Sequence, residues 1–283
     1  MSFLPLSIGT CEIYWLRGGD FRLDGGAMFG PVPKKIWQKQ VQVAADNTIL
    51  LCNEPLLIRT PDRNILVDSG LGNKLTEKEQ AVFSISSPWH LLSQLALLGL
   101  SRHDIDLVIL THGDFDHAGG VVMVGEEGGE EVTFPAATHL IQESEWQSVI
   151  APCRRAQESY WPINFNQLQQ SGRIQFVQGD HQLCPEVSVR HTGGHTLGHQ
   201  LVEISSQGET AVHLGDLFPT HAHTNPLWVM AYDNFPLEVV ACKQRYFREY
   251  RQRDAWFTLY HDPLVRACKV GDKGKIMDRW PRP

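Results

Sequence analysis

The apolar positions fall mostly in short runs rich in Val, Ile and Leu, and clusters of Gly, Pro, Asn and Asp separate these runs. Short apolar runs bounded by turn residues are typical of buried β-strands. An acidic stretch at residues 125–131 predicts a solvated hairpin tip. Strands are expected at residues 8–16, 48–51 running on into 56–59, 64–67, 107–110, 137–141, 173–177, 187–190, 200–204, 210–214 and 256–260.

Three segments carry the signals of α-helices. Leucines three and four positions apart in residues 89–100 predict an amphipathic helix that Gly99 ends. Residues 143–149 read as the start of a second helix. The third, 236–250, is preceded by Asp233 and Asn234 and begins with a proline, which is favoured in a first helical turn. The mixture of strands and helices predicts the α/β class.

Two segments lack a regular pattern. Residues about 21–40 contain glycines and prolines that argue against a regular element, yet they carry Met28, Phe29 and Trp37. Such an apolar loop either docks on its own core or overhangs a cleft as a lid for an apolar substrate, and both alternatives stay open. Residues about 151–170 are aromatic, polar and poorly periodic, so we expect an irregular or helical insertion.

Composition limits the class of protein. The 283 residues are 42% hydrophobic, which suits one globular domain over 1–283. The net charge of −7 argues against nucleic acid as a partner, and the apolar runs are too short to span a membrane. The N-terminus lacks the basic and apolar regions of an export signal, and the six cysteines are scattered singly. We therefore expect a cytoplasmic protein with reduced cysteines.

A cluster of possible metal ligands directly follows the expected strand 107–110. His112, Asp114 and Asp116 are two positions apart, so an extended segment would place them on one side. His117 points elsewhere and can reach a second ion, so the spacing suggests two metals. The alternative is a polar loop or a helix N-terminus with capping aspartates.

Further histidines and aspartates stand at the ends of other expected strands. His195 lies in the segment H-T-G-G-H-T-L-G-H after 187–190, Asp216 follows 210–214, and His261 follows 256–260. Asp68 follows 64–67, where it is either a turn residue or a hydrogen-bond partner of a metal-binding histidine. Strand ends in α/β proteins are favoured places for ligand sites.

The order H-x-H-x-D-H, G-H-T-x-G-H, aspartate and late histidine resembles the metallo-β-lactamase superfamily over nearly the whole chain, with aspartate at position 114 in place of histidine. The resemblance implies an αββα sandwich, in which helices flank two mixed β-sheets. It implies one metal on His112, residue 114 and His195, a second on Asp116, His117 and His261, and Asp216 as the bridging ligand.

The aspartate at position 114 changes the expected metal chemistry. A carboxylate can ligate a divalent ion, and oxygen-reducing di-iron relatives carry an acidic residue at this place. Compared with histidine, Asp114 makes the ligand set one charge more negative, so the ions become weaker Lewis acids. The expected cofactors are two divalent ions, zinc by resemblance, with manganese or iron favoured by Asp114. The shorter side chain draws the metal closer, ligates it through water, or leaves that site partly empty.

Two segments resemble the YtnP-type quorum-quenching N-acyl homoserine lactonases: L-D-G-G-A-M-F-G from residue 23 and P-T-H-A-H-T-N-P-L-W-V-M-A-Y-D from residue 219. The resemblance implies a metal-dependent hydrolase that acts on ester bonds and opens a lactone ring by attack of a metal-bridging hydroxide. By the same resemblance, Asp116 carries a proton to the leaving oxygen. The expected partner is a small lactone or ester with an apolar tail, and a homodimer is expected from the resemblance.

Substrate contacts are expected from the lid and from the segment after Asp216. Met28, Phe29 and Trp37 are expected to line the cleft and contact the acyl chain. Related lactonases often place a tyrosine shortly after the bridging aspartate, where this chain offers His221 or His223, although each histidine alone is more often a structural residue.

Two other functions are compatible with these residues. A broader carboxylesterase or organophosphate triesterase would use the same metal pair and apolar pocket. A detuned, non-catalytic ligand-binding protein would follow if Asp114 disables the site. The six remaining ligands argue against the second alternative, because a site freed from catalysis has little reason to keep them.

Overall fold

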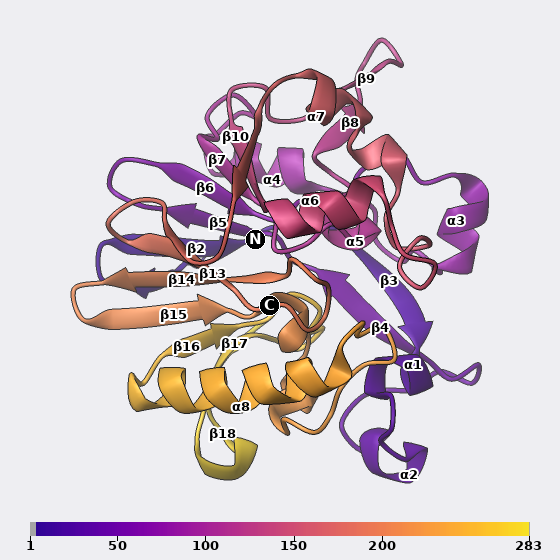
Figure 1. The fold of residues 1–283 in the computed structure, drawn as a ribbon, viewed down its shortest axis with the longest axis vertical. Coiled ribbons are helices and arrows are strands. Elements are labelled where there is room, and N and C mark those ends of the chain that lie inside the picture. Colours follow the sequence, from indigo (N-terminus) through magenta and orange to yellow (C-terminus); the bar gives the residue numbers. More distant parts are fainter. Residues whose placement is uncertain (1–3, 283) are drawn as a thin grey trace.

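The computed structural model describes residues 4–282, so Met1, Ser2 and Phe3 of the expected N-terminus lie outside it. Within these residues, two seven-stranded sheets with parallel and antiparallel pairs form the centre of the fold (Figure 1). The first sheet contains, in order, β1 (Leu6–Ile8), β2 (Cys11–Trp15), β5 (Leu56–Arg59), β6 (Asn64–Val67), β7 (Leu107–Ile109), β10 (Thr138–Gln142) and β11 (Ile174–Val177). The second contains β12 (His181–Gln182), β13 (Val187–His191), β14 (Gln200–Ser206), β15 (Glu209–His213), β16 (Trp256–Thr258), β17 (Val265–Val270) and β18 (Ile276–Pro281).

Helices cover the outer faces of both sheets, as the expected αββα sandwich requires (Figure 1). The helices α4 (Leu91–Leu97), α6 (Glu143–Ile150) and α7 (Asn166–Gln170) contribute to the core outside the first sheet, and α8 (Pro236–Gln252) packs on the second. Side chains alternate along each strand. In β6, Ile65 and Val67 join the core between the sheets, whereas Leu66 joins the core beneath α4.

The N-terminal part contains more regular structure than the sequence suggested. The expected strand 8–16 is a hairpin of β1 and β2, because Gly9 has a positive φ of 55° at the turn. The expected irregular lid contains β3 (Gly19–Asp24), α1 (Gly25–Phe29) and α2 (Lys34–Trp37). Asp24 caps α1 by accepting a hydrogen bond from the Ala27 amide, and β3 pairs with β4 (Thr48–Asn53).

The remaining elements lie around this sandwich. The acidic segment forms the expected hairpin of β8 (Val122–Val124) and β9 (Glu130–Val132), and the short helix α5 (Phe115–Ala118) contains Asp116 and His117 of the histidine and aspartate cluster. The helix α3 (Glu77–Val82) was not expected, although a capping box of Thr76 and Glu79 starts it. The part of the chain that the structure covers contains no helix long and apolar enough to cross a bilayer.

Candidate metal centre

Five segments that follow strands of the two sheets meet at one place. From the first sheet, β6 leads to Asp68 and β7 leads to residues 111–117. From the second sheet, β13 leads to His195, β15 to Asp216, and β16 to His261. The structure thereby brings together all the residues expected to hold metal: His112, Asp114, Asp116, His117, His195, Asp216 and His261.

The first ligand group consists of His112, Asp114 and His195, whose ligand atoms all lie within 4.8 Å of one another. Asp114 Oδ2 lies 3.7 Å from His112 Nε2 and 3.4 Å from His195 Nε2. Although Asp114 precedes α5, its side chain makes no capping hydrogen bond with that helix. The carboxylate therefore faces the two imidazoles, which rules out the capping interpretation for this aspartate.

The second ligand group consists of Asp116, His117 and His261. The Nε2 atoms of His117 and His261 are 3.1 Å apart, and Asp116 Oδ2 lies 3.9 and 3.6 Å from them. Asp216 stands between the groups. Its Oδ1 is 3.2 Å from Nε2 of both His117 and His261, and its Oδ2 is 3.6 Å from His195 Nε2. One oxygen of the same carboxylate thus faces each group.

The spacing and the unpaired atoms of both groups fit divalent metal ions. Donor atoms about 2.0–2.2 Å from a tetrahedral zinc ion are about 3.3–3.6 Å from each other. The distances in both groups surround this value. Within residues 4–282, the buried atoms His112 Nε2, His195 Nε2 and Asp216 Oδ1 have no hydrogen-bond partner. Other buried atoms of this range are also unpaired, but these three converge on one centre, where bound cations would satisfy them.

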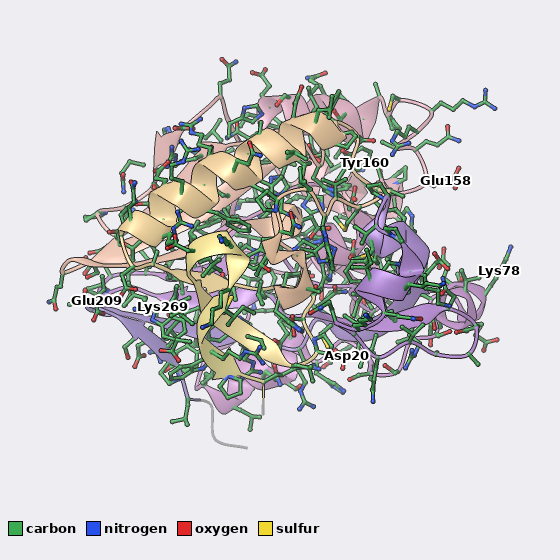
Figure 2. The ribbon with its side chains drawn as sticks, turned by 90° about the horizontal axis from the view of Figure 1, so that it is seen from below. Asp20, Lys78, Glu158, Tyr160, Glu209 and Lys269 are labelled. Atoms are coloured by element: carbon green, nitrogen blue, oxygen red, sulfur yellow. The ribbon has the colours of Figure 1, made fainter. Side chains whose placement is uncertain are left out.

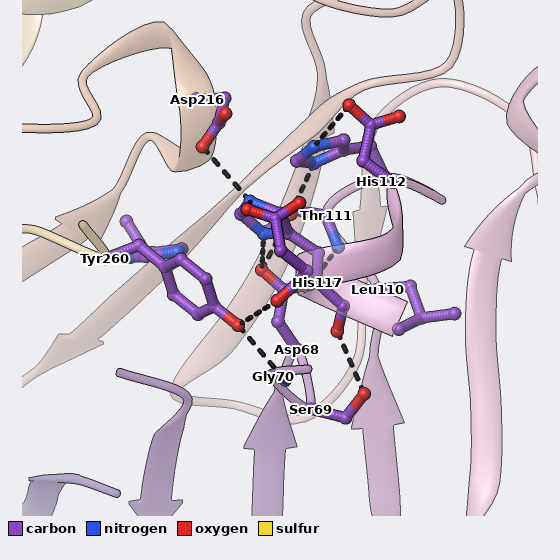
Figure 3. Close-up of polar contacts among 12 residues, drawn as sticks. Asp68, Ser69, Gly70, Leu110, Thr111, His112, His117, Asp216 and Tyr260 are labelled. Carbon is purple, nitrogen blue, oxygen red and sulfur yellow. Dashed lines mark hydrogen bonds and ion pairs between the residues drawn. The ribbon is translucent and has the colours of Figure 1, made fainter. Parts of the chain in front are cut away.

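The opposite side of each imidazole is held by a hydrogen bond. His117 Nδ1 donates to Asp68 Oδ2 at 2.9 Å, and the Thr111 hydroxyl donates to the same oxygen at 2.8 Å (Figure 3). The Thr111 oxygen is then free to accept from His112 Nδ1 at 2.9 Å. Asp68 therefore supports two histidines, one directly and one through Thr111, which is the second of the two roles expected for it.

The two histidines from the second sheet are held in the same manner. His195 Nδ1 donates to Asp233 Oδ1 at 2.8 Å, and His261 Nδ1 donates to the Cys52 carbonyl oxygen at 3.1 Å. With the proton on Nδ1, each Nε2 presents its lone pair to the centre. This is the tautomer that a histidine needs in order to ligate metal through Nε2.

Burial and the mixed charges perturb the proton affinities. Burial raises the pKa of Asp116 and lowers the pKa of His112. Burial also opposes protonation of His117, but Asp216, Asp116 and Asp68 raise its pKa well above the ordinary value. The carboxylates thus need positive charge nearby, and divalent ions would supply it in place of protons.

A cavity of about 340 Å³ opens onto both ligand groups. Its polar end is formed by Asp114, Asp116, His195, Asp216 and His261. Its remaining wall is largely apolar and is lined by Leu23, Met28, Leu51, Phe83, Phe115 and Met230, with Tyr232, Arg155, Glu158 and Ser159 completing it. Figure 2 shows Glu158 at the periphery of the molecule.

The structure corrects part of the expected substrate wall. Met28 lines the cavity, whereas Phe29 and Trp37 do not and are only 0% and 1% exposed. Phe29 lies between other rings, with Trp37 stacked at 5.0 Å and His223 at 4.7 Å. The two aromatic residues of the lid therefore anchor it to the core, while Met28 faces the cavity.

The two histidines expected near the substrate also lie elsewhere. His223 is fully buried, and its ring bonds Thr220 Oγ1 at 2.8 Å and the Met28 carbonyl oxygen at 2.9 Å. His221 bonds Asp262 and lines a separate cavity with residues of β4 and the lid. Neither lines the cavity at the ligand groups.

Several residues of this site were not identified from the sequence. Asp233 was interpreted as a helix start, but it binds His195 and accepts from the Met230 amide at 2.8 Å. The Tyr260 hydroxyl donates to the Asp116 carbonyl oxygen at 3.0 Å and accepts from the Gly70 amide at 3.1 Å (Figure 3). Its position next to His261 was the available signal. Tyr232 lies in the lactonase-like segment that starts at residue 219, which was the available signal, whereas Glu145 carried no distinctive sequence signal.

Comparison with known proteins places these features in context. The family model of the metallo-beta-lactamase superfamily matches residues 55–261. A probable metal-dependent hydrolase from Staphylococcus aureus superposes with a TM-score of 0.93 and 39% identity, covering 98% of this chain and 99% of that chain. AidC, a dizinc quorum-quenching lactonase in complex with a product, superposes with a TM-score of 0.80 and 22% identity, covering 100% and 98%. In sequence, an N-acyl homoserine lactonase from Bacillus sp. is 24% identical over 228 residues, which are 76% of this chain and 83% of that protein.

Proposed function

The chain belongs to the metallo-beta-lactamase superfamily of metallo-hydrolases, and we propose that it opens the ring of lactones, with N-acyl homoserine lactones as its substrate class. The observation that carries this proposal is one cavity that joins both ligand groups to an apolar wall. Ligand pockets are typically about 300–1,000 Å³. A cavity of about 340 Å³ therefore suits a compact ring with an acyl chain of short or medium length.

Two divalent ions are part of this proposal. His112, Asp114 and His195 would hold one ion, and Asp116, His117 and His261 would hold the other. Asp216 faces both groups and would be a ligand shared between them. Bound there, the ions would polarise the ester carbonyl and make a water acidic enough to act as a nucleophile near neutral pH. The likeness to a dizinc lactonase supports zinc as the bound metal. The carboxylate of Asp114 supports manganese or iron instead.

Two residues at the cavity have roles in handling substrate. Asp116 lines the cavity as well as the second ligand group, and in this proposal its carboxylate passes a proton to the leaving oxygen. Tyr232 donates a hydrogen bond to the acyl part of the substrate. Burial, with Asp24 and Asp116 as further causes, raises the pKa of Tyr232 to about 12, so its hydroxyl keeps its proton at neutral pH.

Metal removal and a substrate panel test the function. Dialysis against a chelator is expected to abolish hydrolysis of N-hexanoyl homoserine lactone, and adding back zinc, manganese or iron should restore it. The lactone should be preferred over aryl esters and phosphotriesters by about tenfold or more in kcat/KM, which corresponds to about 1.4 kcal/mol. Faster turnover of either competitor would favour the esterase or triesterase, and no turnover by metal-loaded protein would favour a ligand-binding protein.

Two lid variants should separate substrate contact from anchoring. Met28→Ala is expected to reduce the preference for long over short acyl chains by about tenfold, because it removes part of the wall that a long chain would contact, and each CH₂ group of the chain buried there is worth about 0.8 kcal/mol. Phe29→Ala should instead lower the free energy of unfolding by about 3–5 kcal/mol, since it removes a core ring. Lactone kinetics and urea unfolding measure both effects. A larger change in chain preference for Phe29→Ala than for Met28→Ala would contradict these assignments.

A further inference from the structure

Glu145 is a fully buried carboxylate in the first turn of α6, outside the two ligand groups. Its oxygens accept hydrogen bonds from four donors. Oε1 accepts from the Gly113 amide at 2.8 Å and from the Tyr160 hydroxyl at 2.9 Å. Oε2 accepts from the Thr196 hydroxyl at 2.7 Å and from the Gly198 amide at 3.0 Å.

These donors belong to the segments that carry the first ligand group. Gly113 lies between His112 and Asp114, and Thr196 directly follows His195. The first segment continues from β7 in one sheet, and the second continues from β13 in the other sheet. A single side chain thus connects the loops of two different sheets at the point where they jointly form a ligand group.

The two loops also contact α6 without spare room. A Cβ atom added at Gly198 would lie 2.2 Å from the Glu145 backbone nitrogen. A Cβ atom added at Gly113 would lie 2.5 Å from Val149 Cγ2, also in α6. The glycines therefore allow both loops to approach the helix, where the carboxylate of Glu145 binds their amides.

We infer that Glu145 is a positioning residue for the first metal. By holding Gly113 and the 196–198 segment on one carboxylate, it sets the separation of His112 and Asp114 from His195. The inference rests on the proposed binding of metal by this group. Glu145 has no contact with substrate in this role. It acts on the first group only, because Tyr260 connects the loops of the second group.

The glutamine variant is a sharp probe because its shape is nearly unchanged. A glutamine amide has one accepting and one donating end. Each oxygen of Glu145 accepts from a backbone amide, Gly113 on one side and Gly198 on the other. In either orientation, Glu145→Gln would direct its NH₂ group at one of these N–H groups. One loop must then move away from α6.

The test is cobalt(II) binding to metal-free protein, measured by competition with a chelator and by visible absorption. Glu145→Gln is expected to bind one ion about 10–100-fold more weakly, the usual effect of losing a residue that orients ligands, while the second ion stays close to wild type. Tyr160→Phe removes one donor and should cause a smaller loss. Glu203→Gln is the control, because Glu203 accepts from Tyr250 and Arg253 on the far side of the second sheet.

Wild-type affinity for both ions in Glu145→Gln would overturn the inference, and so would equal weakening of both. If Glu145→Gln does not fold, Thr196→Val provides the same test, because it deletes one donor on the His195 side and keeps the carboxylate. Thr196→Val should then weaken the same single ion. Metal binding is measured without substrate, so failure of lactone hydrolysis would contradict the proposed function while leaving this inference standing.

Discussion

Replacing Asp216 with alanine is expected to release metal from both ligand groups and to abolish lactone hydrolysis. Its Oδ1 lies 3.2 Å from Nε2 of His117 and His261, and its Oδ2 lies 3.6 Å from His195 Nε2. Residues that only support a ligand are worth about 10–100-fold in metal affinity. Loss of a shared ligand should therefore exceed about 100-fold for each ion. Elemental analysis after gel filtration and chelator competition measure the effect.

Asp68→Asn provides the graded comparison. Asp68 supports His117 directly and His112 through Thr111, and it faces neither ion position. We expect an intermediate loss of about 10–100-fold, with part of the hydrolytic activity retained. Thermal unfolding of the metal-free proteins checks that both variants keep the fold.

Retention of two ions per chain at wild-type affinity in Asp216→Ala would mean that this carboxylate does not ligate either ion.

Histidines and aspartates at strand ends could be located from the sequence alone because strand ends lie at the edges of sheets. The apolar run 107–110 and the polar residues behind it suffice to place His112 through His117 beside a sheet edge. The order of the other strand ends then matched a known family pattern. What the sequence could not provide was which oxygen of Asp216 faces which group, since this depends on how the two sheets are packed.

Residues that support the ligands through long-range contacts were harder to predict. Asp233 and His195 are separated by 38 positions, and Glu145 and Thr196 by 51. Each of these carboxylates has a local explanation, because Asp233 precedes a helix and Glu145 lies in a first helical turn. Local signals therefore hide their function. Only the tertiary structure shows that both carboxylates contact segments that carry metal-ligating candidates.

Two of the three lid residues that were expected to contact substrate, Phe29 and Trp37, do not line the cavity, for a related reason. An apolar residue in a loop has two destinations, the core or a cavity, and sequence spacing does not decide between them. The short helix α1 turns adjacent residues to different sides, so Met28 borders the cavity while Phe29 packs on Trp37. The unexpected helix thus explains why one residue of the lid reaches the cavity and its neighbour does not.

Asp114→His is expected to make the protein faster with zinc, and relatively less dependent on manganese, iron or cobalt, than the wild type. Asp114 Oδ2 is 3.4 Å from His195 Nε2, and its side chain is 15% exposed where it lines the cavity. Histidine removes one negative charge from the ligand group. The ions should then polarise the substrate carbonyl more strongly. Half-maximal activity should occur at lower pH, and each unit by which the pKa of the metal-bound water falls corresponds to about 1.4 kcal/mol.

The same substitution has a competing effect on geometry. If the backbone before α5 is adapted to a short carboxylate, an imidazole would displace the ion from His112 and His195, and the electrostatic gain would be hidden. Metal content and lactone turnover across pH are therefore measured for both proteins with each metal. Loss of one ion in Asp114→His would mean that the group is built around aspartate. Equal metal retention and equal pH profiles would instead show that residue 114 does not touch the metal, because a change of one charge at about 2 Å from a divalent ion must alter both.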